Sequence, residues 1–362
     1  MVLLFMLPVT LRVTHDPQKT LSEASLLLVA IGAFFFIITL CFSADSLRRL
    51  VTLFILAGLF IAIVIPVCVD WQLRQPPGPL IEVYRVLPHV AGFSVHPNSL
   101  AVCLLACLPF YLGLLLFGAK EMRLSELGFI SVAVLLGLAS LLLSWSLGGW
   151  TGMAVALLLL VQLRWRKRGL LAILASGAIL TCFLLLSQSP AVKVFTSQEI
   201  LEPLRLRYEL WLRAFFLIRD SPITGIGMGT YRETVDSLYP LIVYPYGDIP
   251  HPHAHNVYLQ LGVDLGLPGL FAWLSLLTTA FIAAWQIFRI GRDRSDPWLM
   301  GFGAGLLCSQ MGLMVHGLVD NVALIFWPVW GLAIGCRYLL FRMKPPYPKI
   351  HSKMKPDKTP SA

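Results

Sequence analysis

The chain has 362 residues, of which 57% are hydrophobic and 13% are charged. Because soluble domains carry roughly 25% charged residues, this composition excludes a soluble globular protein. It predicts a polytopic membrane protein folded as an all-α transmembrane helical bundle. The net charge of +9 would suit a nucleic-acid-binding protein, but the basic residues gather in short loops between apolar segments. We therefore attribute the charge to contact with membrane lipids and expect no nucleic-acid partner.

The chain begins with an apolar stretch, residues 1–11, that is too short to cross a membrane. No basic region precedes it and no small-residue cleavage site follows it, so we do not expect a cleavable signal peptide. We interpret the stretch as the end of a span whose start is absent, which predicts missing N-terminal spans. The alternative is an N-terminal stretch that lies in the membrane interface.

Nine later segments are apolar enough for membrane spans, which need about 20 mostly apolar residues each. They are residues 24–42, 50–69, 99–118, 127–146, 149–163, 169–187, 259–288, 298–318 and 322–341. They predict transmembrane helices over residues 1–187 and 259–343, separated by a polar segment at 188–258. The Pro- and Lys-rich tail, residues 344–362, is expected to be disordered.

The loops between these spans differ in lysine and arginine content, which orients the chain. The basic loops are residues 43–49, 119–123, 164–168 and 289–296, together with the tail. The alternate loops, 144–150 and 319–321, contain neither lysine nor arginine. We place the basic loops and the C-terminus in the cytoplasm, so the segment at 188–258 is predicted to be extracytoplasmic.

The first half of the polar segment predicts an amphipathic helix over residues 204–218. Leu204, Tyr208, Trp211 and Phe215 follow the spacing of one apolar helix face. Four arginines lie on or beside this helix: Arg205, Arg207, Arg213 and Arg219. They form either a face that binds lipid headgroups or an anion clamp, because guanidinium donors match phosphate oxygens. The glycines that follow match a nucleotide-binding loop only weakly, since no Lys-Ser/Thr comes after them.

Residues 251–256, with the sequence HPHAHN, hold three of the eight histidines of the chain. Three interpretations of this His loop remain open. A metal site is disfavoured, because a spacing of two follows no helix face and only Asp248 lies close by as a carboxylate. A structural role would have a histidine cap the span that follows. A catalytic role would use imidazole as a general base, which suits proton transfer near neutral pH.

Three more polar stretches fall at predicted outer ends of spans: residues 94–101, 144–150 and 316–321. Together with the arginine-bearing helix and the His loop, they place five polar elements on the same side of the membrane. Because polar groups at membrane depth mark functional cavities, we expect one extracytoplasmic site.

These stretches resemble the O-antigen ligase/polymerase (Wzy_C) family, which is related in architecture to the GT-C glycosyltransferases. The resemblance rests on Arg207, Trp211, Ala214, Ile218, Asp220, Pro222, Thr224, Gly225, Gly227, Gly229, Tyr231, residues 253–260 and residues 266–270. Residues 92–101 resemble an upstream family segment, and the resemblance covers roughly residues 85–340. Where the family usually has Ser-Arg-Gly, this chain has Leu147 in place of the arginine.

The resemblance implies a multi-pass enzyme of the cytoplasmic (inner) membrane that needs neither a metal nor a cofactor. It would transfer a glycan, with inversion, from an undecaprenyl (polyprenyl) pyrophosphate donor to an acceptor hydroxyl on a lipid, polysaccharide or protein. His255 corresponds to the essential loop histidine, and Arg207 to the arginine that holds the pyrophosphate. Further substrate-binding residues are expected at Arg205, Arg213, His253, Asn256, His96 and Asn98.

Leu147 removes one positive charge that the family directs at the leaving group, and Arg205 or Arg213 is the expected replacement. An alternative function is transport of a small anion, since a cyanobacterial branch of the same family has carried the label of bicarbonate transporter. Transporters often contain internal repeats, and this sequence shows none. The long external segment also favours an enzyme over a carrier.

Overall fold

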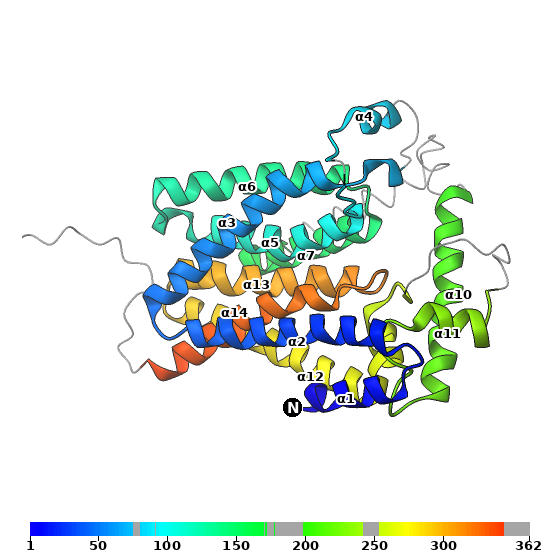
Figure 1. Ribbon diagram of the computed structural model, residues 1–362. Coiled ribbons are helices and arrows are strands. Elements are labelled where there is room, and N and C mark those ends of the chain that lie inside the picture. The colour runs from blue at the N-terminus through cyan, green and yellow to red at the C-terminus, as the bar shows by residue number, and fades with distance from the viewer. Residues whose placement is uncertain are drawn as a thin grey trace, which may run out of the picture. The chain divides into compact units, whose positions relative to one another are not determined.

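The computed structural model (Figure 1) describes residues 1–74, 80–90, 92–169, 171, 177, 198–241 and 253–343. Within these ranges the regular structure is helical, apart from an isolated β-bridge between Val69 and Val95. Among the described residues, eight helices are long and apolar enough to cross a membrane. The prediction of an all-α polytopic bundle is therefore confirmed. The predicted span at 169–187 and the tail at 344–362 fall largely or wholly outside the described residues.

The eight candidate spans are Pro17–Leu40, Ala44–Cys68, Pro97–Glu121, Leu124–Leu143, Leu147–Trp165, Val257–Asp293, Pro297–His316 and Ala323–Arg342. They contain helices α2 (Pro17–Leu40), α3 (Ala44–Cys68), α5 (Pro97–Gly118), α6 (Leu124–Leu143), α7 (Leu147–Trp165), α12 (Val257–Asp293), α13 (Pro297–His316) and α14 (Phe326–Arg342). The remaining helices are α1 (Val2–Val13), α4 (Leu80–Val86), α10 (Gln198–Asp220) and α11 (Tyr231–Leu238), with short 3₁₀ turns at Trp71–Leu73, Ala119–Glu121 and Ala323–Ile325.

The chain divides into two compact units, each built from three separate segments. The first unit comprises Met1–Phe34, Val161–Thr279 and Leu313–Pro328. The second unit comprises Phe35–Leu160, Ala280–Gly312 and Val329–Ala362. The predicted boundaries at residues 187 and 258 divide the chain in sequence order. The contacts instead group segments that are far apart in the sequence.

The second unit is held by close approach of helix backbones. A Cβ atom added to Gly113 of α5 would lie 2.6 Å from the Cα of Gly305 in α13. At the contact of α7 with α13, a Cβ on Gly152 would lie 2.6 Å from the carbonyl oxygen of Gly312. Small residues at these crossings let membrane helices pack tightly where lipid supplies no hydrophobic drive. Helices α3, α5 and α6 also pack against one another in this unit (Figure 1).

The first unit has a small core where α11 lies across α10 (Figure 1). The buried face of α10 consists of Leu210, Ala214 and Leu217. The predicted helix is present, and two residues of its predicted apolar stripe, Tyr208 and Phe215, are 61% and 60% exposed. Helix α10 is apolar on two sides, and spacing alone does not say which side meets α11.

Helix α12 is broken at Gly266, whose backbone has φ 67° and ψ −179°. A Cβ at this position would lie 2.4 Å from the carbonyl oxygen of Ile223, so a side chain does not fit. The Leu267 N–H, freed by the break, donates to the Pro222 carbonyl at 2.7 Å. A polar backbone at a break in an apolar helix needs such a partner, and the Pro-Ile-Thr-Gly loop supplies it.

The glycine-rich loop after α10 serves the fold. Gly225, Gly227 and Gly229 all have positive φ, which glycine adopts without steric cost. The Met228 N–H donates to Thr10 Oγ1 at 2.9 Å, and Thr20 Oγ1 donates to the Met228 carbonyl at 2.9 Å. The loop therefore ties α1 and α2 to the broken helix α12.

Candidate functional site

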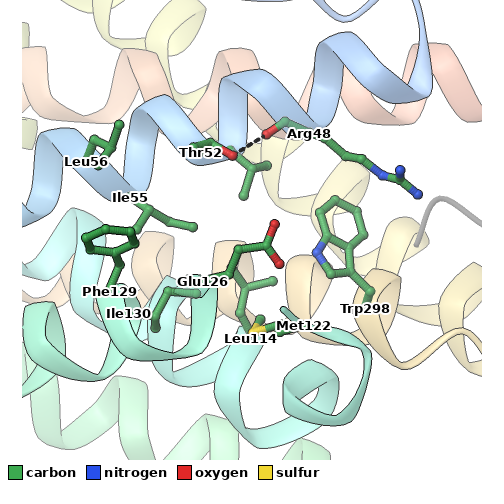
Figure 2. Close-up of a pocket in the computed structure, with 11 residues that line it drawn as sticks. Arg48, Thr52, Ile55, Leu56, Leu114, Met122, Glu126, Phe129, Ile130 and Trp298 are labelled. Carbon is green, nitrogen blue, oxygen red and sulfur yellow. Dashed lines mark hydrogen bonds between the residues drawn. The ribbon is translucent and has the colours of Figure 1, made fainter. Parts of the chain in front are cut away.

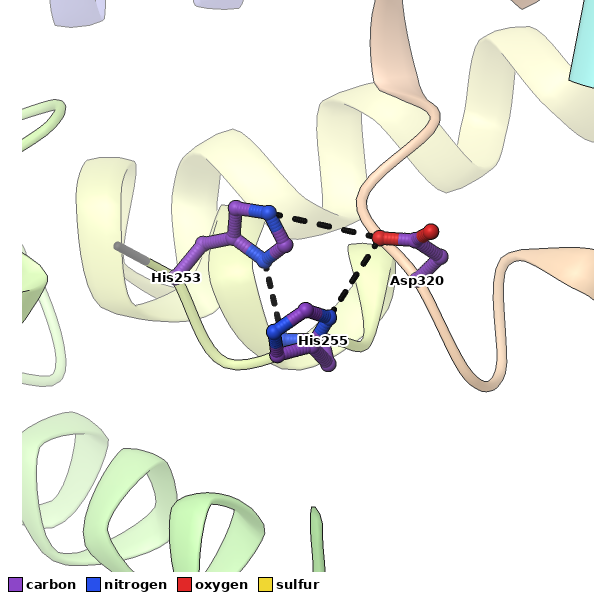
Figure 3. Close-up of side chains that lie close together, drawn as sticks. All are labelled: His253, His255 and Asp320. Carbon is purple, nitrogen blue, oxygen red and sulfur yellow. Dashed lines mark hydrogen bonds and ion pairs between the residues drawn. The ribbon is translucent and has the colours of Figure 1, made fainter. Parts of the chain in front are cut away.

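Two histidines of the His loop and one aspartate form a cluster within the first unit (Figure 3). His255 Nδ1 lies 3.5 Å from Asp320 Oδ1, and His253 Nε2 lies 4.0 Å from the same oxygen. The rings of the two histidines are 4.2 Å apart between centroids. Each histidine side chain keeps about a quarter of its surface exposed, at 26% and 25%, and Asp320 keeps 13%. A substrate can thus reach both imidazoles.

Hydrogen bonding assigns the proton of His253. The backbone N–H of His255 donates to His253 Nδ1 at 3.2 Å, so Nδ1 is the acceptor nitrogen. A neutral His253 therefore carries its proton on Nε2, which faces the Asp320 carboxylate.

The same carboxylate favours a proton on Nδ1 of His255, which leaves Nε2 of that ring as the basic nitrogen. His255 Nδ1 is buried and makes no hydrogen bond to any described residue, so at 3.5 Å it lies close to Asp320 Oδ1 without a hydrogen bond. A carboxylate that orients an imidazole in this way is the arrangement of catalytic triads.

Asp320 is held in its charged form. Burial disfavours the carboxylate, but contact with His255 and the charges of His255, His253 and His316 outweigh burial and lower the pKa of Asp320 below its usual range. Asp320 is thus an anion throughout the neutral range and stabilises positive charge on the neighbouring imidazoles.

The His loop has a constrained backbone. His255 has φ 47°, a left-handed conformation that non-glycine residues rarely adopt. The neighbouring Ala254 N–H donates to Gln260 Oε1 at 2.7 Å, and Gln260 Nε2 donates to Asp264 Oδ1 at 2.8 Å. A backbone held in such a region costs about 1–3 kcal/mol and persists where surrounding contacts fix it. Gln260 and Asp264 are such contacts.

Asn256 joins the His loop to the loop that carries Asp320. Its Oδ1 accepts hydrogen bonds from the Tyr258 and Leu259 N–H groups at 3.0 and 3.1 Å, which caps the start of α12. Its Nδ2 donates to the Leu318 carbonyl at 3.1 Å. The described residue that caps this span is therefore Asn256, and the interpretation that a histidine caps it is wrong for His253 and His255.

Helix α10 brings Arg207 to the same loop. Its Nε donates to the Val319 carbonyl at 3.2 Å, next to Asp320 in the chain. Burial lowers the pKa of Arg207, and the charge of Asp320 acts against this shift. His316, at the end of α13, is 1% exposed, and neither of its ring nitrogens bonds a described residue.

The predicted site residues Arg205 and Arg213 also lie on α10. Arg205 is exposed on α10. Arg213 is 7% exposed, and its guanidinium donates to the Tyr239 and Pro240 carbonyls, each at 3.0 Å. These contacts engage Arg213 in holding the chain after α11.

His96 and Asn98 belong to the second unit, at the start of α5. His96 is exposed, and its Nδ1 accepts the Asn98 N–H at 3.1 Å. Arg74 donates to Asn98 Oδ1, and its Nε donates to the Ser144 carbonyl at 3.1 Å. Leu147, which stands in place of the family arginine, begins α7 and is 45% exposed. Through its bond to the Ser144 carbonyl, Arg74 places a cation at the turn before α7.

The five predicted polar elements are thus grouped in two sets. The first unit collects α10, the His loop and residues 316–321. The second unit collects residues 94–101 and 144–150. Asp320 and Gln260 were not among the predicted site residues. A carboxylate at the predicted outer end of a span was the available signal for Asp320, while Gln260 lies in an apolar run that gives no such signal.

The cluster also bears on the metal question. One atom from each of His253, His255 and Asp320 can lie within 4.8 Å of the others. Two imidazoles and one carboxylate are ligands that zinc and iron accept. Asp320 supplies the carboxylate that the His loop itself lacks. The donor set alone therefore does not decide between a metal site and a general base.

Comparison with known proteins agrees with the geometry. The family model described as O-antigen ligase (Wzy_C) matches residues 132–274. These residues form an O-antigen ligase domain. No curated protein matches the chain. The predicted family resemblance is confirmed, and with its apolar helices the chain is a multi-pass membrane protein with a domain of the glycan-transfer type.

The O-antigen ligase domain includes Arg207, Asn256 and both described histidines of the cluster, but the match ends before Asp320. The family implies a lipid-linked glycan donor and a polysaccharide or lipid acceptor in general. Asp320 therefore enters the site on the evidence of geometry alone.

Proposed function

We propose that this protein transfers a glycan from a polyprenyl-pyrophosphate donor to an acceptor hydroxyl at the outer face of the cytoplasmic membrane. The transfer inverts the anomeric centre and requires no metal. The observation that carries the proposal is the placement of His255, Asp320 and Arg207 in one unit, with His255 and Arg207 inside the O-antigen ligase domain.

The three residues have distinct roles in this reaction. Asp320 holds the Nδ1 proton of His255, and Nε2 takes the proton of the acceptor hydroxyl. The acceptor oxygen attacks the anomeric carbon from the face opposite the pyrophosphate, and the bond from that carbon to the phosphate oxygen breaks. Arg207 offsets the negative charge that grows on the leaving pyrophosphate. The proton held by His255 then passes to solvent, which restores the base.

Two other predicted residues support this reaction without taking part in bond changes. Arg205, exposed on α10, adds positive charge toward the donor. His253 directs its own proton at Asp320 and so helps to hold the carboxylate in position beside His255.

The test uses purified full-length protein in detergent with synthetic undecaprenyl-pyrophosphate glycans, and measures donor binding and release of free undecaprenyl pyrophosphate. His255→Ala is expected to bind the donor without releasing the pyrophosphate. Arg207→Gln is expected to lose donor binding as well. Arg219→Gln, an exposed arginine at the far end of the same helix, is the matched control and should behave as wild type.

The result that contradicts the proposal is wild-type protein that neither binds nor cleaves any such donor. Uptake of labelled bicarbonate into vesicles containing the protein would then test the transport alternative. Supplying lipid, polysaccharide and peptide acceptors separately identifies the acceptor class once release has been seen.

A further inference from the structure

The second unit contains a cavity of about 340 Å³ between α3, α6 and the start of α13 (Figure 2). Its volume lies within the roughly 300–1,000 Å³ typical of ligand sites. Leu114 and Ile130, which are 0% and 1% exposed, form part of its wall. Trp298 also lines the cavity, and most of the surface of the cavity is apolar. An apolar cavity of this size within membrane-spanning helices suits a hydrocarbon chain.

Three polar side chains make one end of the cavity polar, while the other end is apolar. Arg48 and Thr52 come from the first turns of α3, and Glu126 from the first turn of α6. Figure 2 shows Arg48 and Trp298 at one end of the cavity and Leu56 and Phe129 at the other. From Arg48 to Leu56 the cavity follows α3 for about 12 Å, at 1.5 Å per residue.

The polar end lies where the helices meet the basic loops. Helix α3 begins within the loop at 43–49, α6 follows the loop at 119–123, and α13 follows the loop at 289–296. Helix ends of this kind reach the level of lipid headgroups. The apolar end of the cavity therefore extends toward the lipid core, as an acyl chain does.

The charges at the polar end are mixed. Arg48 Nε is buried and has no hydrogen-bond partner among the described residues, while its Nη1 lies 3.9 Å from Asp45 Oδ1. Glu126 Oε2 accepts the Arg123 N–H at 3.0 Å, which fixes the carboxylate at the cavity. One guanidinium beside two carboxylates does not favour an anionic headgroup. It favours a headgroup with one phosphate and one amine.

We propose that this cavity binds a phospholipid of the phosphatidylethanolamine class from the leaflet at the basic end of the helices. One acyl chain fills the cavity beside Leu114 and Ile130. The phosphate accepts hydrogen bonds from Arg48, and the ammonium donates to Glu126. This site is independent of the glycan-transfer proposal, because every residue in it lies in the second unit.

Trp298 provides the measurement, because bromine on a lipid acyl chain quenches the fluorescence of an indole in contact with it. Purified full-length protein in detergent is titrated with brominated-acyl phosphatidylethanolamine, phosphatidylcholine and phosphatidylglycerol. Trp298→Phe identifies the part of the signal that comes from the cavity. We expect saturable quenching that this variant lacks, with about tenfold tighter binding of the ethanolamine lipid than of the other two.

Matched variants separate the chain and headgroup parts of the site. Thr52→Phe fills the cavity and should abolish the Trp298 signal, whereas Leu53→Phe, 60% exposed and one residue along, should not. Arg48→Gln should weaken binding of every phospholipid about tenfold, and Arg49→Gln should have no effect. Glu126→Gln keeps a residue that suits its helix-capping position and should remove only the preference for the amine.

Three outcomes would overturn the proposal. Quenching that does not depend on Trp298 would show that lipid contacts other tryptophans and not the cavity. Equal binding of all three lipids, or tighter binding of phosphatidylglycerol, would contradict the assignment of the headgroup. Insensitivity to Thr52→Phe in a variant that unfolds at the wild-type temperature would contradict the assignment of the acyl chain.

Discussion

The two units use opposite means to place their side chains. In the first unit, His255, Asp320 and Arg207 come from three separate elements. Arg207 donates to a loop carbonyl, the His255 N–H donates to His253 Nδ1, and His255 has a strained backbone. In the second unit, contacts such as Gly113 with Gly305 bring helix backbones together without polar side chains. The candidate catalytic residues thus lie on loops and helix ends, while tight helix packing depends on small residues at helix crossings. Substitutions in the two units should therefore separate activity from stability.

The largest effect is expected for His255→Ala. A general base contributes about 10²–10⁴-fold in rate, and this variant should lose that factor in glycan transfer. Its thermal unfolding should change little, because no described side-chain hydrogen bond of His255 is lost. His15→Ala, an exposed histidine of the same unit, is the control. A loss of folded protein parallel to the loss of rate would mean that the His loop is structural.

Asp320→Asn should reduce the rate by about 10²-fold, because the imidazole then lacks the carboxylate that orients it and stabilises its charged form. Asp320→Glu should recover part of the rate. The measurement is the initial rate of pyrophosphate release at saturating donor. Full activity of Asp320→Asn would remove the carboxylate from the mechanism.

The same residue gives a prediction about pH. Since the folded-state pKa of Asp320 is lowered, its contribution to stability is present above its ordinary pKa of about 3.9 and is lost only as the pH falls through the lower folded value. Asp320 therefore stays charged from pH 5 to 8, roughly the range where histidine titrates. The fraction of the rate lost in Asp320→Asn should therefore be the same at every pH in this range, because the wild-type carboxylate stays charged throughout it. A loss that disappears toward pH 5 would show that Asp320 is protonated in the folded protein at that pH.

In the second unit, Gly113→Leu should lower the free energy of unfolding by about 1–3 kcal/mol or more, since the added side chain meets the backbone of α13. Gly128→Leu on α6 is the control, because nothing lies within 4 Å of a Cβ at that position. Thermal unfolding in detergent measures both. Equal stability of the two variants would contradict backbone-to-backbone packing of α5 and α13.

Two arginines of α10, Arg207 and Arg213, should differ in their effects on stability and on donor binding. Arg213→Gln should cost about 1–3 kcal/mol of stability, because it removes charged hydrogen bonds to Tyr239 and Pro240. The Arg213→Gln protein that remains folded should still bind donor, whereas Arg207→Gln, which loses one hydrogen bond to the Val319 carbonyl, should fail to bind even when folded. If Arg213→Gln instead loses donor affinity at unchanged stability, Arg213 contacts the substrate, as its place in the sequence predicts.

The smallest expected effect is that of a chelator. Glycan transfer in the presence of EDTA should equal the untreated rate, since the two histidines are arranged by Asp320 and by the His255 N–H without a metal in the mechanism. Metal analysis of the purified protein accompanies the assay. Activity that disappears with EDTA and returns with zinc would make the cluster a metal centre.

Several properties follow from the sequence alone. Runs of apolar residues are local and long, so the spans were predicted, and eight of them are present among the described residues. The family resemblance rests on residues close together in the chain, and the match to residues 132–274 confirms it. The helix over residues 204–218 was predicted for the same reason, since helical periodicity is a property of neighbours.

The contacts between residues far apart in the sequence became known only from the tertiary structure. The sequence does not show that Asp320 faces His253 and His255, or that Asn256 links the two loops through the Leu318 carbonyl. It also does not show which apolar side of α10 is buried, because that side is set by the packing of α11. Local patterns specify which segments are helical and apolar. The partner of each polar group depends on which segments the packed helices bring together, and no short stretch of sequence contains that information.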